Sequence, residues 1–584
     1  MKVTWVLFVL VVAPIVVAFL AGYYLHLEDT FLAKRSTNLD EGEHINAQRL
    51  LVGLVNAVQR KSAHLQEAER RPPLRVALGY NANLDLVARA TEVVRSIVGE
   101  APQQDVEELK PQPHAKISSL VAFQQALAHF FTQGSAAERW MEDKREFQQV
   151  VAAASSSPTA IFSPGGNAAL MAQRFAAEGN VVLLGGPVGS RLASLLDSRI
   201  SYPSSSSRSS SAVDGDDEVH LILEYSKGEL WPTSSSSMKA PRANRFILVH
   251  DERNSMLSGL EELHAALPDF HPDLLVLAGL HLLSDGEEKE NDSTEERSKE
   301  EKEVDKGILR LHKVAEEMKE LASRRNKFAT MTERPAIHLE LASIADSRFL
   351  SRLAALLLPT WVDSLGLNEQ ELGSLLFALS SSTSASNALL QPSPPSLSAF
   401  VSPDVQTVVD GIHSLFRWIQ AEQQMRRSKN SEVEEEEEVG LTRIHFHSLH
   451  FHIVAIRKLP QHHCKEVVDE QEKKQKKECT LWKNGGEASV AAGSLAASKQ
   501  ACGVDLDDAQ SLQAAHVLLP PQSVKPLRGS SSHEIQVNGS LGVTSWSDGG
   551  IEFYLAPVLV CKHPSKTVGL GDAISTMGLV RALS

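Results

Sequence analysis

Residues 566–575, KTVGLGDAIS, run directly into the apolar-periodic stretch Ile574–Leu583 near the C-terminal end of the sequence. Gly569–Gly571 predict a tight turn, and Asp572 then falls in the first turn of a helix. The N–H groups and the positive dipole end of such a helix favour a phosphate or a developing oxyanion. A carboxylate beside that turn fits a base that takes a proton from an alcohol during phosphoryl transfer. The alternative for this stretch alone is a helix cap without a ligand.

Length and composition limit the classes of protein that fit. The chain has 584 residues, which predicts one catalytic body with two lobes, lengthened by low-complexity insertions. Its net charge of −15 disfavours a nucleic-acid partner, because no basic stripe is available to neutralise phosphates. The four cysteines have no Cys-x-x-Cys spacing, which argues against a zinc site: Cys464, Cys479, Cys502 and Cys561.

The N-terminal segment 1–26 contains a nearly unbroken apolar run, Val3–Leu25, of 23 residues. A run of this length either spans a bilayer as an uncleaved anchor or serves as a secretory signal. Both interpretations direct the chain to the secretory membrane system. The run continues through Tyr23 and Tyr24, an interfacial pair that favours the anchor. The sequence therefore predicts an anchored protein, with a secreted or luminal protein as the alternative.

Two stretches place polar or glycine residues where parallel strands bind ligands. A buried strand over Leu74–Leu78 opens into a turn followed by Asn83 and Asp85. Further along, the turn Gly165, Gly166 and Asn167 starts a helix, and a buried strand follows it. The alternatives are an Asx-turn connector at the first stretch and a tight turn without a ligand at the second.

Charged residues on other elements complete the candidate set. Residues 100–160 look helical and amphipathic, and Glu138 lies within them. Arg245 stands at the entry of another strand, and Glu340 lies on a strand of its own. Glu369 and Glu371 begin a helix, where they either cap it or join Glu340 around a hydrated magnesium ion.

A histidine-rich stretch, LTRIHFHSLHFHIVA, alternates as a strand does. We interpret its histidines as strand residues rather than as a metal cluster, because no carboxylate or cysteine completes a recognisable site: His445, His447, His450 and His452.

The order of these motifs resembles that of the ADP-dependent sugar kinases of the ribokinase-like superfamily. The matching pieces extend from residue 79 to residue 575: GYNANLDLV, GSAAERW, SPGGNAALMA, NRFI, HLELAS, DSLGLNEQEL, RIHFHSL and TVGLGDAIS. The insertions between them match nothing that we can name.

The resemblance implies transfer of a phosphoryl group from ADP to glucose, with magnesium as cofactor and Asp572 as the catalytic base. It assigns the anion hole to Gly569, Leu570 and Gly571, and a phosphate contact to Arg245. The hexose would be held by Asn83, Asp85, Glu138, Gly165, Gly166 and Asn167, with Glu138 favouring glucose over fructose 6-phosphate. Glu340, Glu369 and Glu371, together with Asp572, would be the metal-associated carboxylates. An ATP-using sugar kinase and an inactive, membrane-tethered sugar-binding protein are the alternatives.

The resemblance also implies a domain division and a location. The larger, Rossmann-like α/β domain would comprise residues 38–88, 161–190 and 266–584, with insertions near 283–306, 380–398 and 428–439. A smaller α/β lid domain would comprise residues 89–160 and 191–265. The expected location is the endoplasmic reticulum membrane, and we expect a monomer, because the surface insertions offer no obvious self-complementary apolar patch.

Overall fold

The computed structural model describes residues 49–58, 72–98, 109–203, 217–232, 238–283, 306–325, 335–344, 346–381, 396–429, 440–458, 465–469, 474–478, 482, 485–503, 515–517, 542–561 and 569–583. The predicted anchor, Cys464, Cys479 and most of the predicted insertions lie outside these residues. No helix within the described ranges has the length and apolarity to cross a bilayer.

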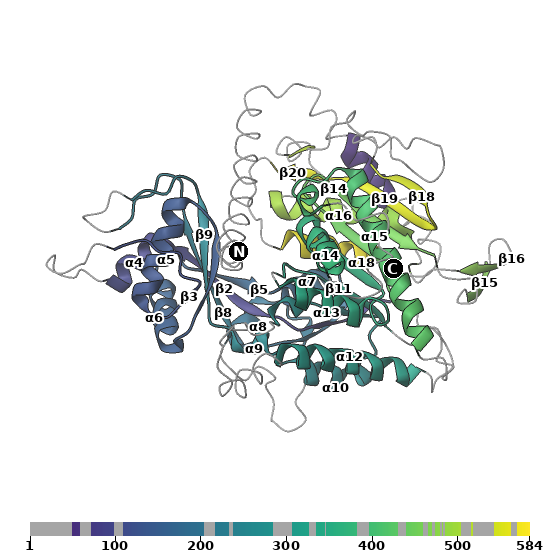
Figure 1. Ribbon diagram of the computed structural model, residues 1–584, viewed down its shortest axis with the longest axis horizontal. Coiled ribbons are helices and arrows are strands. Elements are labelled where there is room, and N and C mark those ends of the chain that lie inside the picture. Colours follow the sequence, from purple (N-terminus) through teal and green to yellow (C-terminus); the bar gives the residue numbers. More distant parts are fainter. Residues whose placement is uncertain are drawn as a thin grey trace, which may run out of the picture.

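A large mixed sheet forms the centre of the first domain (Figure 1). Its seven strands from β13 to β7 are parallel, and three antiparallel strands extend one edge. The central strands are continuous apolar runs such as VVLL and LLVL, as expected where both faces of a sheet are buried. In spatial order the strands are β18 (Thr544–Asp548), β19 (Ile551–Pro557), β14 (Phe451–Arg457), β13 (Arg443–His447), β12 (Ser364–Asn368), β11 (Ala336–Glu340), β10 (Leu274–Leu277), β1 (Arg75–Gly79), β6 (Val181–Gly185) and β7 (Ile200–Ser201).

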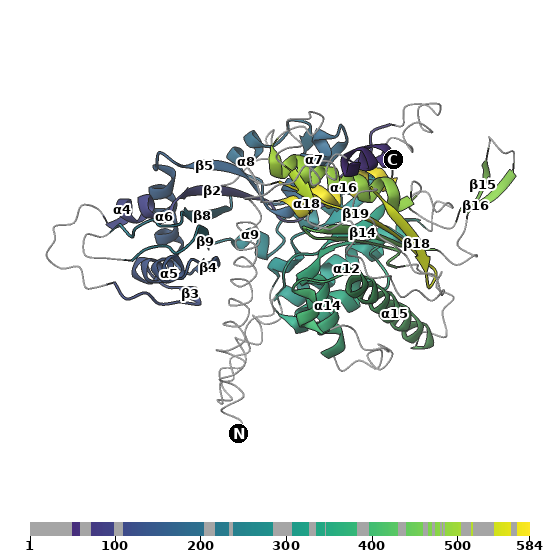
Figure 2. The same cartoon turned by 90° about the horizontal axis from the view of Figure 1, so that it is seen from above.

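Helices cover both faces of this sheet, each over its own apolar core (Figures 1 and 2). One face carries α10 (Leu260–Phe270), α12 (Lys306–Arg325), α13 (Ser347–Leu357), α14 (Glu369–Ser381) and α15 (Val405–Lys429). The other carries a helix over 49–58, α7 (Asn167–Ala177), α8 (Ser190–Leu195), α16 (Gly485–Cys502) and α18 (Leu570–Leu583). The predicted α/β class is therefore confirmed, and the helix predicted to contain Asp572 in its first turn is α18.

The second domain is built on a six-stranded sheet, seen on the left in Figure 1. Helices α4 (Ala90–Val98), α5 (Leu120–Gln133) and α6 (Lys144–Ser155) pack on one face of it over a separate core. In spatial order its strands are β3 (Lys116–Ile117), β4 (Ala137–Met141), β9 (Asn244–Val249), β8 (Val219–Tyr225), β2 (Asn83–Arg89) and β5 (Ile161–Gly165). The chain thus has the two lobes expected from its length.

Strand pairing divides the chain differently from the predicted domains. Strands β2 and β5, which were assigned to the larger domain, pair with each other and belong to the second sheet. Strand β7, assigned to the lid, pairs with β6 in the large sheet. Sequence order could not reveal this, because a strand belongs to the sheet whose strands it hydrogen-bonds, and those partners lie far away along the chain.

The prediction of helix throughout residues 100–160 is wrong around Glu138. Gly134 adopts the left-handed conformation, with φ of 62°, and its N–H bonds the last carbonyls of α5. A left-handed glycine is a common helix terminator, so the chain leaves the helix there and enters strand β4 with Glu138 on it.

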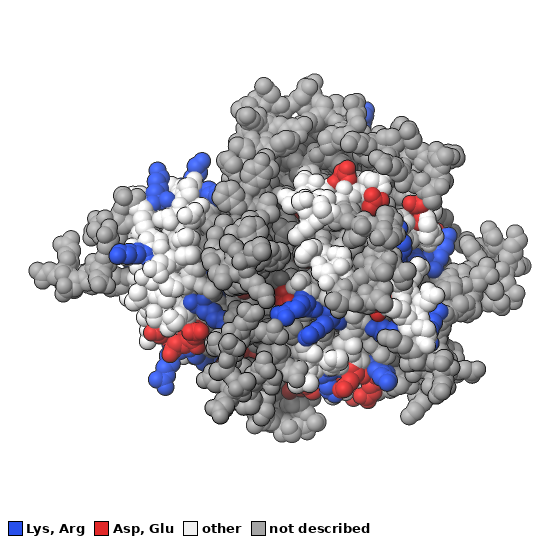
Figure 3. Space-filling model, viewed as in Figure 1, with Lys and Arg blue, Asp and Glu red and all other residues white. Residues whose placement is uncertain are grey.

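Shorter elements complete the description. They are α9 (Glu252–Ser255), the 3₁₀ turns η2 (Leu280–Leu282) and η4 (Leu397–Phe400), and the strands β15 (Lys465–Asp469), β16 (Lys474–Glu478), β17 (Ala515–Val517) and β20 (Leu559–Cys561). On the face seen in Figure 3, the basic side chains of the described residues are scattered over both domains among acidic ones.

Candidate active site

A pocket of about 300 Å³ opens at the carboxyl edge of the large sheet. Glu340, Asn368 and His447 are the last residues of the adjacent parallel strands β11, β12 and β13, and all three line it. The N-terminus of α18 closes the pocket with Gly569, Leu570, Gly571 and Asp572. Parallel strands place their carboxyl ends at one edge, so residues distant in sequence meet where a helix N-terminus can hold an anion.

Asp572 is buried at this helix start, and a residue 405 positions earlier in the chain hydrogen-bonds it. The side-chain amide of Asn167, at the start of α7, donates a hydrogen bond of 2.9 Å to Oδ1 of Asp572. Burial and the charge of Glu340 raise the pKa of Asp572 to about 7, although the bond from Asn167 acts in the opposite direction. A carboxylate with a pKa near neutrality is suited to exchanging a proton with substrate.

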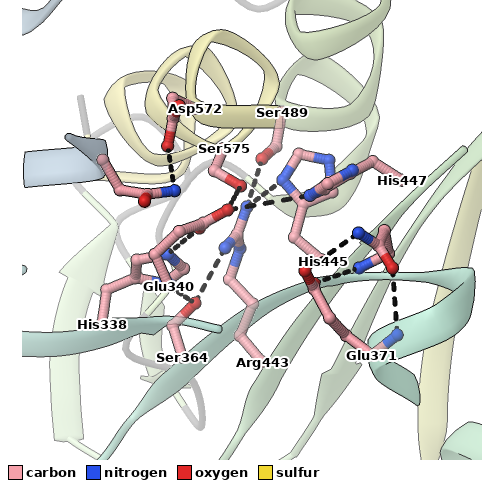
Figure 4. Close-up of polar contacts among 12 residues, drawn as sticks. His338, Glu340, Ser364, Glu371, Arg443, His445, His447, Ser489, Asp572 and Ser575 are labelled. Carbon is pink, nitrogen blue, oxygen red and sulfur yellow. Dashed lines mark hydrogen bonds and ion pairs between the residues drawn. The ribbon is translucent and has the colours of Figure 1, made fainter. Parts of the chain in front are cut away.

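Glu340 lies deeper in the pocket and is held on both oxygens (Figure 4). Nε2 of His338 is 2.9 Å from Oε2, and the hydroxyl of Ser575 donates to Oε1 over 3.1 Å. Burial would raise the pKa of Glu340, but the hydrogen bonds and charges of His338 and His447 outweigh it and lower this pKa to about 2. Glu340 therefore stays ionised across the physiological pH range.

His447 forms an ion pair in the same place, with Nε2 3.7 Å from Oε1 of Glu340. Burial alone would lower the pKa of His447, but the carboxylates of Glu340 and Glu371 raise it above its usual value. A Cβ at position 571 would lie 2.9 Å from Cε1 of His447, so glycine at that position lets the helix start approach the imidazole.

Glu371 caps its own helix, as one of the two sequence interpretations predicted. Its oxygens accept from the backbone N–H of Asn368 at 2.8 Å and from the Asn368 side-chain amide at 2.9 Å. Oδ1 of Asn368 accepts in return from the N–H of Glu371, which completes a reciprocal cap. Burial raises the pKa of Glu371 to about 8. Glu369 and Glu371 both line the pocket, so capping does not remove them from it.

A second group of predicted residues lies on the six-stranded sheet. Asn83 on β2 faces Gly165 on β5, and Asp85 lies two residues further along the same strand face. Nδ2 of Asn83 donates to Oδ1 of Asp85 at 2.7 Å. A Cβ at position 165 would come within 2.2 Å of that oxygen, and one at position 166 within 2.9 Å of Oδ1 of Asn83. Glycine at these two positions therefore lets the Asn83 and Asp85 side chains lie directly against the backbone of the turn.

Strand register extends this polar face across the sheet. Asp85 is paired with His220 on β8, and Glu138 on β4 lies on the same face through its pairing with Ile247. Nε2 of His220 is 2.9 Å from Oδ2 of Asp251. Burial lowers the pKa of His220, but Asp251, with smaller contributions from Glu138 and Asp85, raises it overall. We call Asn83, Asp85, Glu138, Gly165 and His220 the inner sheet face.

The crossover between the two sheets is anchored by asparagine side chains. Ala82 lies between β1 and β2, and the side chain of Asn254 bonds both its N–H and its C=O at 3.0 Å. Asn254 also donates to Asp251 at 2.6 Å, which links the crossover to His220. Oδ1 of Asn81 accepts from the N–H of Ala168, so the same crossover supports the start of α7, where Gly166 offers no cap.

The predicted residues therefore fall into two groups joined by Asn167. The pocket contains Asp572, the turn before it and the predicted metal-associated carboxylates. The inner sheet face contains four of the predicted sugar-binding residues, Asn83, Asp85, Glu138 and Gly165. The other two, Gly166 and Asn167, follow Gly165 directly, and Asn167 reaches Asp572. Arg245 is not brought to the pocket, because it lies on β9 opposite Glu224.

Sequence reasoning did not select His220, His338, His447 or Ser575 as site residues. A detectable signal existed for His338, which precedes Glu340 by two positions and so shares its strand face. His447 was interpreted as a strand residue; it is one, but the strand ends inside the pocket.

The donor set constrains what cation could bind. No cluster of three or more His, Cys, Asp or Glu side chains within the described residues has the geometry to hold a metal ion directly. Magnesium commonly keeps several waters and contacts protein through one or two carboxylates and substrate phosphates. The carboxylates of Glu340 and Glu369 in one pocket fit that indirect mode.

Comparisons with known proteins give the family. The region described as "ADP-specific Phosphofructokinase/Glucokinase conserved region" matches residues 74–581. The chain is 36% identical over 507 residues to a Bos taurus protein named ADP-dependent glucokinase, covering 86% of this chain and 84% of the relative. It is 30% identical over 508 residues to a Caenorhabditis elegans protein named probable ADP-dependent glucokinase, covering 87% of this chain and 84% of the relative.

Solved structures share the fold. A hypothetical ADP-dependent phosphofructokinase from Pyrococcus horikoshii superposes with a TM-score of 0.59 at 16% identity, covering 88% of this chain and 98% of that one. An ADP-dependent kinase in complex with fructose-6-phosphate and ADPβS superposes with a TM-score of 0.54 at 17% identity. The match covers 91% of this chain and 97% of that one. Because the match extends over residues 74–581, most of its length, this chain belongs to the ADP-specific phosphofructokinase and glucokinase family.

Proposed function

We propose that this protein is an ADP-dependent glucokinase, which transfers the β-phosphoryl group of ADP to the 6-hydroxyl of glucose and releases AMP and glucose 6-phosphate. The observation that carries the proposal is the contact of Asn167 with Asp572, which joins a polar sheet face to an acidic pocket at a helix N-terminus. The glucokinase relatives, which the chain matches over most of its length, support the same choice.

Asp572 is the general base in this proposal. Asn167 occupies Oδ1, which leaves Oδ2 to accept the proton of the sugar hydroxyl. Its pKa of about 7 means that the ionised form is available near neutral pH and still has a driving force for taking the proton. The N–H groups of Gly569–Gly571 would stabilise the transferring phosphoryl group, whose charge grows on its equatorial oxygens.

The sugar would bind on the inner sheet face. Asp85 and Glu138 supply carboxylates for charge-assisted hydrogen bonds to hydroxyls, and Gly165 and Gly166 let the side chains of Asn83 and Asp85 lie close against the backbone. The charge of Glu138 would repel a sugar phosphate, which favours glucose over fructose 6-phosphate. Arg245, on the same sheet, is proposed as a phosphate contact that requires the domains to close.

Magnesium is the proposed cofactor, held through water by Glu340 and Glu369, with Glu371 keeping the start of α14 in place. When bound, it would neutralise phosphate charge. An N-terminal membrane anchor over Val3–Leu25, a location in the endoplasmic reticulum and a monomeric state are proposed from the sequence. The predicted anchor is supported by the length of its apolar run.

The test is product analysis with the full chain, glucose and magnesium, supplying either ADP or ATP. AMP and glucose 6-phosphate formed with ADP, at a rate at least about tenfold above that with ATP, would support the proposal. Equal use of ATP would contradict the donor, and transfer to fructose 6-phosphate but not glucose would contradict the sugar. Binding of glucose without any transfer would favour the sugar-binding protein instead.

A further inference from the structure

Arg443 is a fully buried arginine below the pocket, on strand β13. Its guanidinium donates to Ser364 at 2.8 Å and to Ser489 at 3.0 Å, and it lies 5.4 Å from the centre of the Trp482 ring. None of the described carboxylates forms an ion pair with it, although burying a charge without a counter-ion is costly. A buried cation in this position therefore requires an explanation.

Ser364 connects Arg443 to the pocket (Figure 4). Oγ of Ser364 is 2.9 Å from Nδ1 of His338, and Nε2 of the same imidazole is 2.9 Å from Oε2 of Glu340. Three hydrogen bonds thus run in series from the arginine to the carboxylate: from Arg443 to Ser364, from Ser364 to His338 and from His338 to Glu340.

The two ends of this series can act in only one way. An arginine can donate but cannot accept, and an ionised carboxylate can accept but cannot donate. Ser364 must therefore accept from Arg443, and its own hydrogen is left for Nδ1 of His338. His338 then carries its single proton on Nε2 and donates it to Glu340. The opposite direction would place an unprotonated Nε2 against the carboxylate, where two acceptors repel each other.

We propose that Arg443 is a positioning residue for Glu340, and that it acts through Ser364 and His338 by fixing the direction of all three hydrogen bonds. The expected effect on kcat rests on the proposed function, whereas the direction of the hydrogen bonds does not. The geometry carries this direction, because Ser364 lies 2.8 Å from a guanidinium that can only donate and Nε2 of His338 lies 2.9 Å from a carboxylate that can only accept.

The surroundings of Glu340 show how closely its position is defined. A Cβ at position 366 would lie 2.1 Å from Oε2 of Glu340 and 3.0 Å from the Ser575 hydroxyl, so glycine at that position admits the carboxylate. His338 and Ser575 then hold one oxygen each. Glu340 is thereby fixed in orientation beside Asp572, whose pKa its charge raises. A different orientation of Glu340 would therefore change both the position of the proposed cation-binding carboxylate and the pKa of the proposed base, Asp572.

The chain offers a matched pair of variants to test this. Ser364 and Ser489 are both fully buried serines that accept a hydrogen bond from Arg443. The hydroxyl of Ser489, however, donates to the carbonyl of Gly578 instead of to His338. Ser364→Ala should lower kcat at least about tenfold, as is typical when a second-layer partner of a ligating residue is removed. Glucose KM should stay within about threefold, because the inner sheet face is unchanged. Ser489→Ala should lose similar thermal stability yet keep kcat within about threefold.

A second measurement does not depend on activity. Long-range ¹H–¹⁵N correlation spectra of the ¹⁵N-histidine-labelled full chain report which ring nitrogen carries the proton, and the His338→Gln variant identifies the signal. The expected result is a proton on Nε2 of His338 and none on Nδ1, with that pattern disturbed in Ser364→Ala and retained in Ser489→Ala. A proton on Nδ1 in the unmodified protein would overturn the inference.

The two failures are distinguishable. If no phosphoryl transfer is seen but His338 has the expected tautomer, the proposed function fails while the hydrogen-bond direction stands. If transfer is seen but Ser364→Ala and Ser489→Ala lose kcat equally, or neither loses it, the positioning role of Arg443 is wrong. If Ser364→Ala does not fold, the tautomer of His338 in the unmodified protein still tests the inference.

Discussion

The side-chain amide of Asn167 donates to Oδ1 of Asp572 over 2.9 Å, although 405 positions separate the two residues in the chain. Asn167 begins α7 directly after the glycine pair of the inner sheet face, and Asp572 begins α18 at the pocket. One hydrogen bond therefore joins the surface proposed for the sugar to the proposed base.

This contact predicts how the pH dependence of the reaction should change. The bond from Asn167 stabilises the ionised form of Asp572 and so lowers its pKa. In Asn167→Ala that stabilisation is lost, and the pKa should rise from about 7 by up to about one unit, the equivalent of one hydrogen bond. The acid limb of the kcat profile should shift to higher pH, with partial recovery of rate in alkaline buffer. Asp572→Asn is the control and should lose at least about a hundredfold at every pH. An acid limb that does not move in Asn167→Ala would contradict the assignment of Asp572 as the base.

Gly166 and Gly179 flank α7 and form a natural comparison, because both have φ of 83°. Alanine at position 179 should cost about 1 kcal/mol for the positive φ. Alanine at position 166 should cost more, because the ψ of 131° lies outside the left-handed region. Only at position 166 would the new Cβ meet neighbouring atoms, lying 2.9 Å from the backbone oxygen of Asn81 and from Oδ1 of Asn83, whereas nothing lies within 4 Å at position 179. Thermal melting should show the larger loss in Gly166→Ala, because its Cβ would meet backbone atoms, and glucose KM should rise only in that variant. A rise of equal size in Gly179→Ala would place the sugar elsewhere.

Glu138 is exposed on the inner sheet face, so its removal should affect binding more than stability. Glu138→Gln keeps the shape and removes the charge, and hydrogen bonds to charged acceptors are about twice as strong as neutral ones. Glucose KM should increase about tenfold, which corresponds to about 1.4 kcal/mol, while the melting temperature stays unchanged. Glu224→Gln, another exposed carboxylate on the same sheet, serves as control and should leave KM as it is. If both variants behave alike, Glu138 has no particular role in sugar binding.

Asn254 predicts a link between stability and sugar affinity. Its side chain is fully buried and bonds Ala82 twice and Asp251 once, so Asn254→Ala leaves several polar groups unpaired and should cost about 2–4 kcal/mol. Asn180 is also buried and bridges Leu74 and Phe175, but away from the crossover between the sheets. Both alanine variants should melt at lower temperature. Glucose KM should rise only in Asn254→Ala, because Ala82 leads into β2 and Asp251 orients His220. An unchanged KM in a folded Asn254→Ala protein would show that the crossover does not influence the sugar site.

Local rules account for the parts of the site that sit on single elements. Gly569–Gly571 before an apolar-periodic run predicted the turn and the helix that carry Asp572, because glycine geometry and helix ends depend on a few neighbouring residues. The same holds for the start of α7 after Gly166 and for the capping of α14 by Glu371.

What local rules could not supply is which elements become neighbours. The α/β class, the helix start at Asp572 and the polar residues at strand ends can all be predicted from the residues alone, because they follow from short-range periodicity and backbone preference. Three findings came from the folded chain instead: β2 and β5 belong to the second sheet, Glu138 lies on a strand, and Arg443 lies buried beneath Glu340. Those outcomes depend on long-range strand pairing and on burial, which set hydrogen-bond partners and pKa values through residues hundreds of positions away.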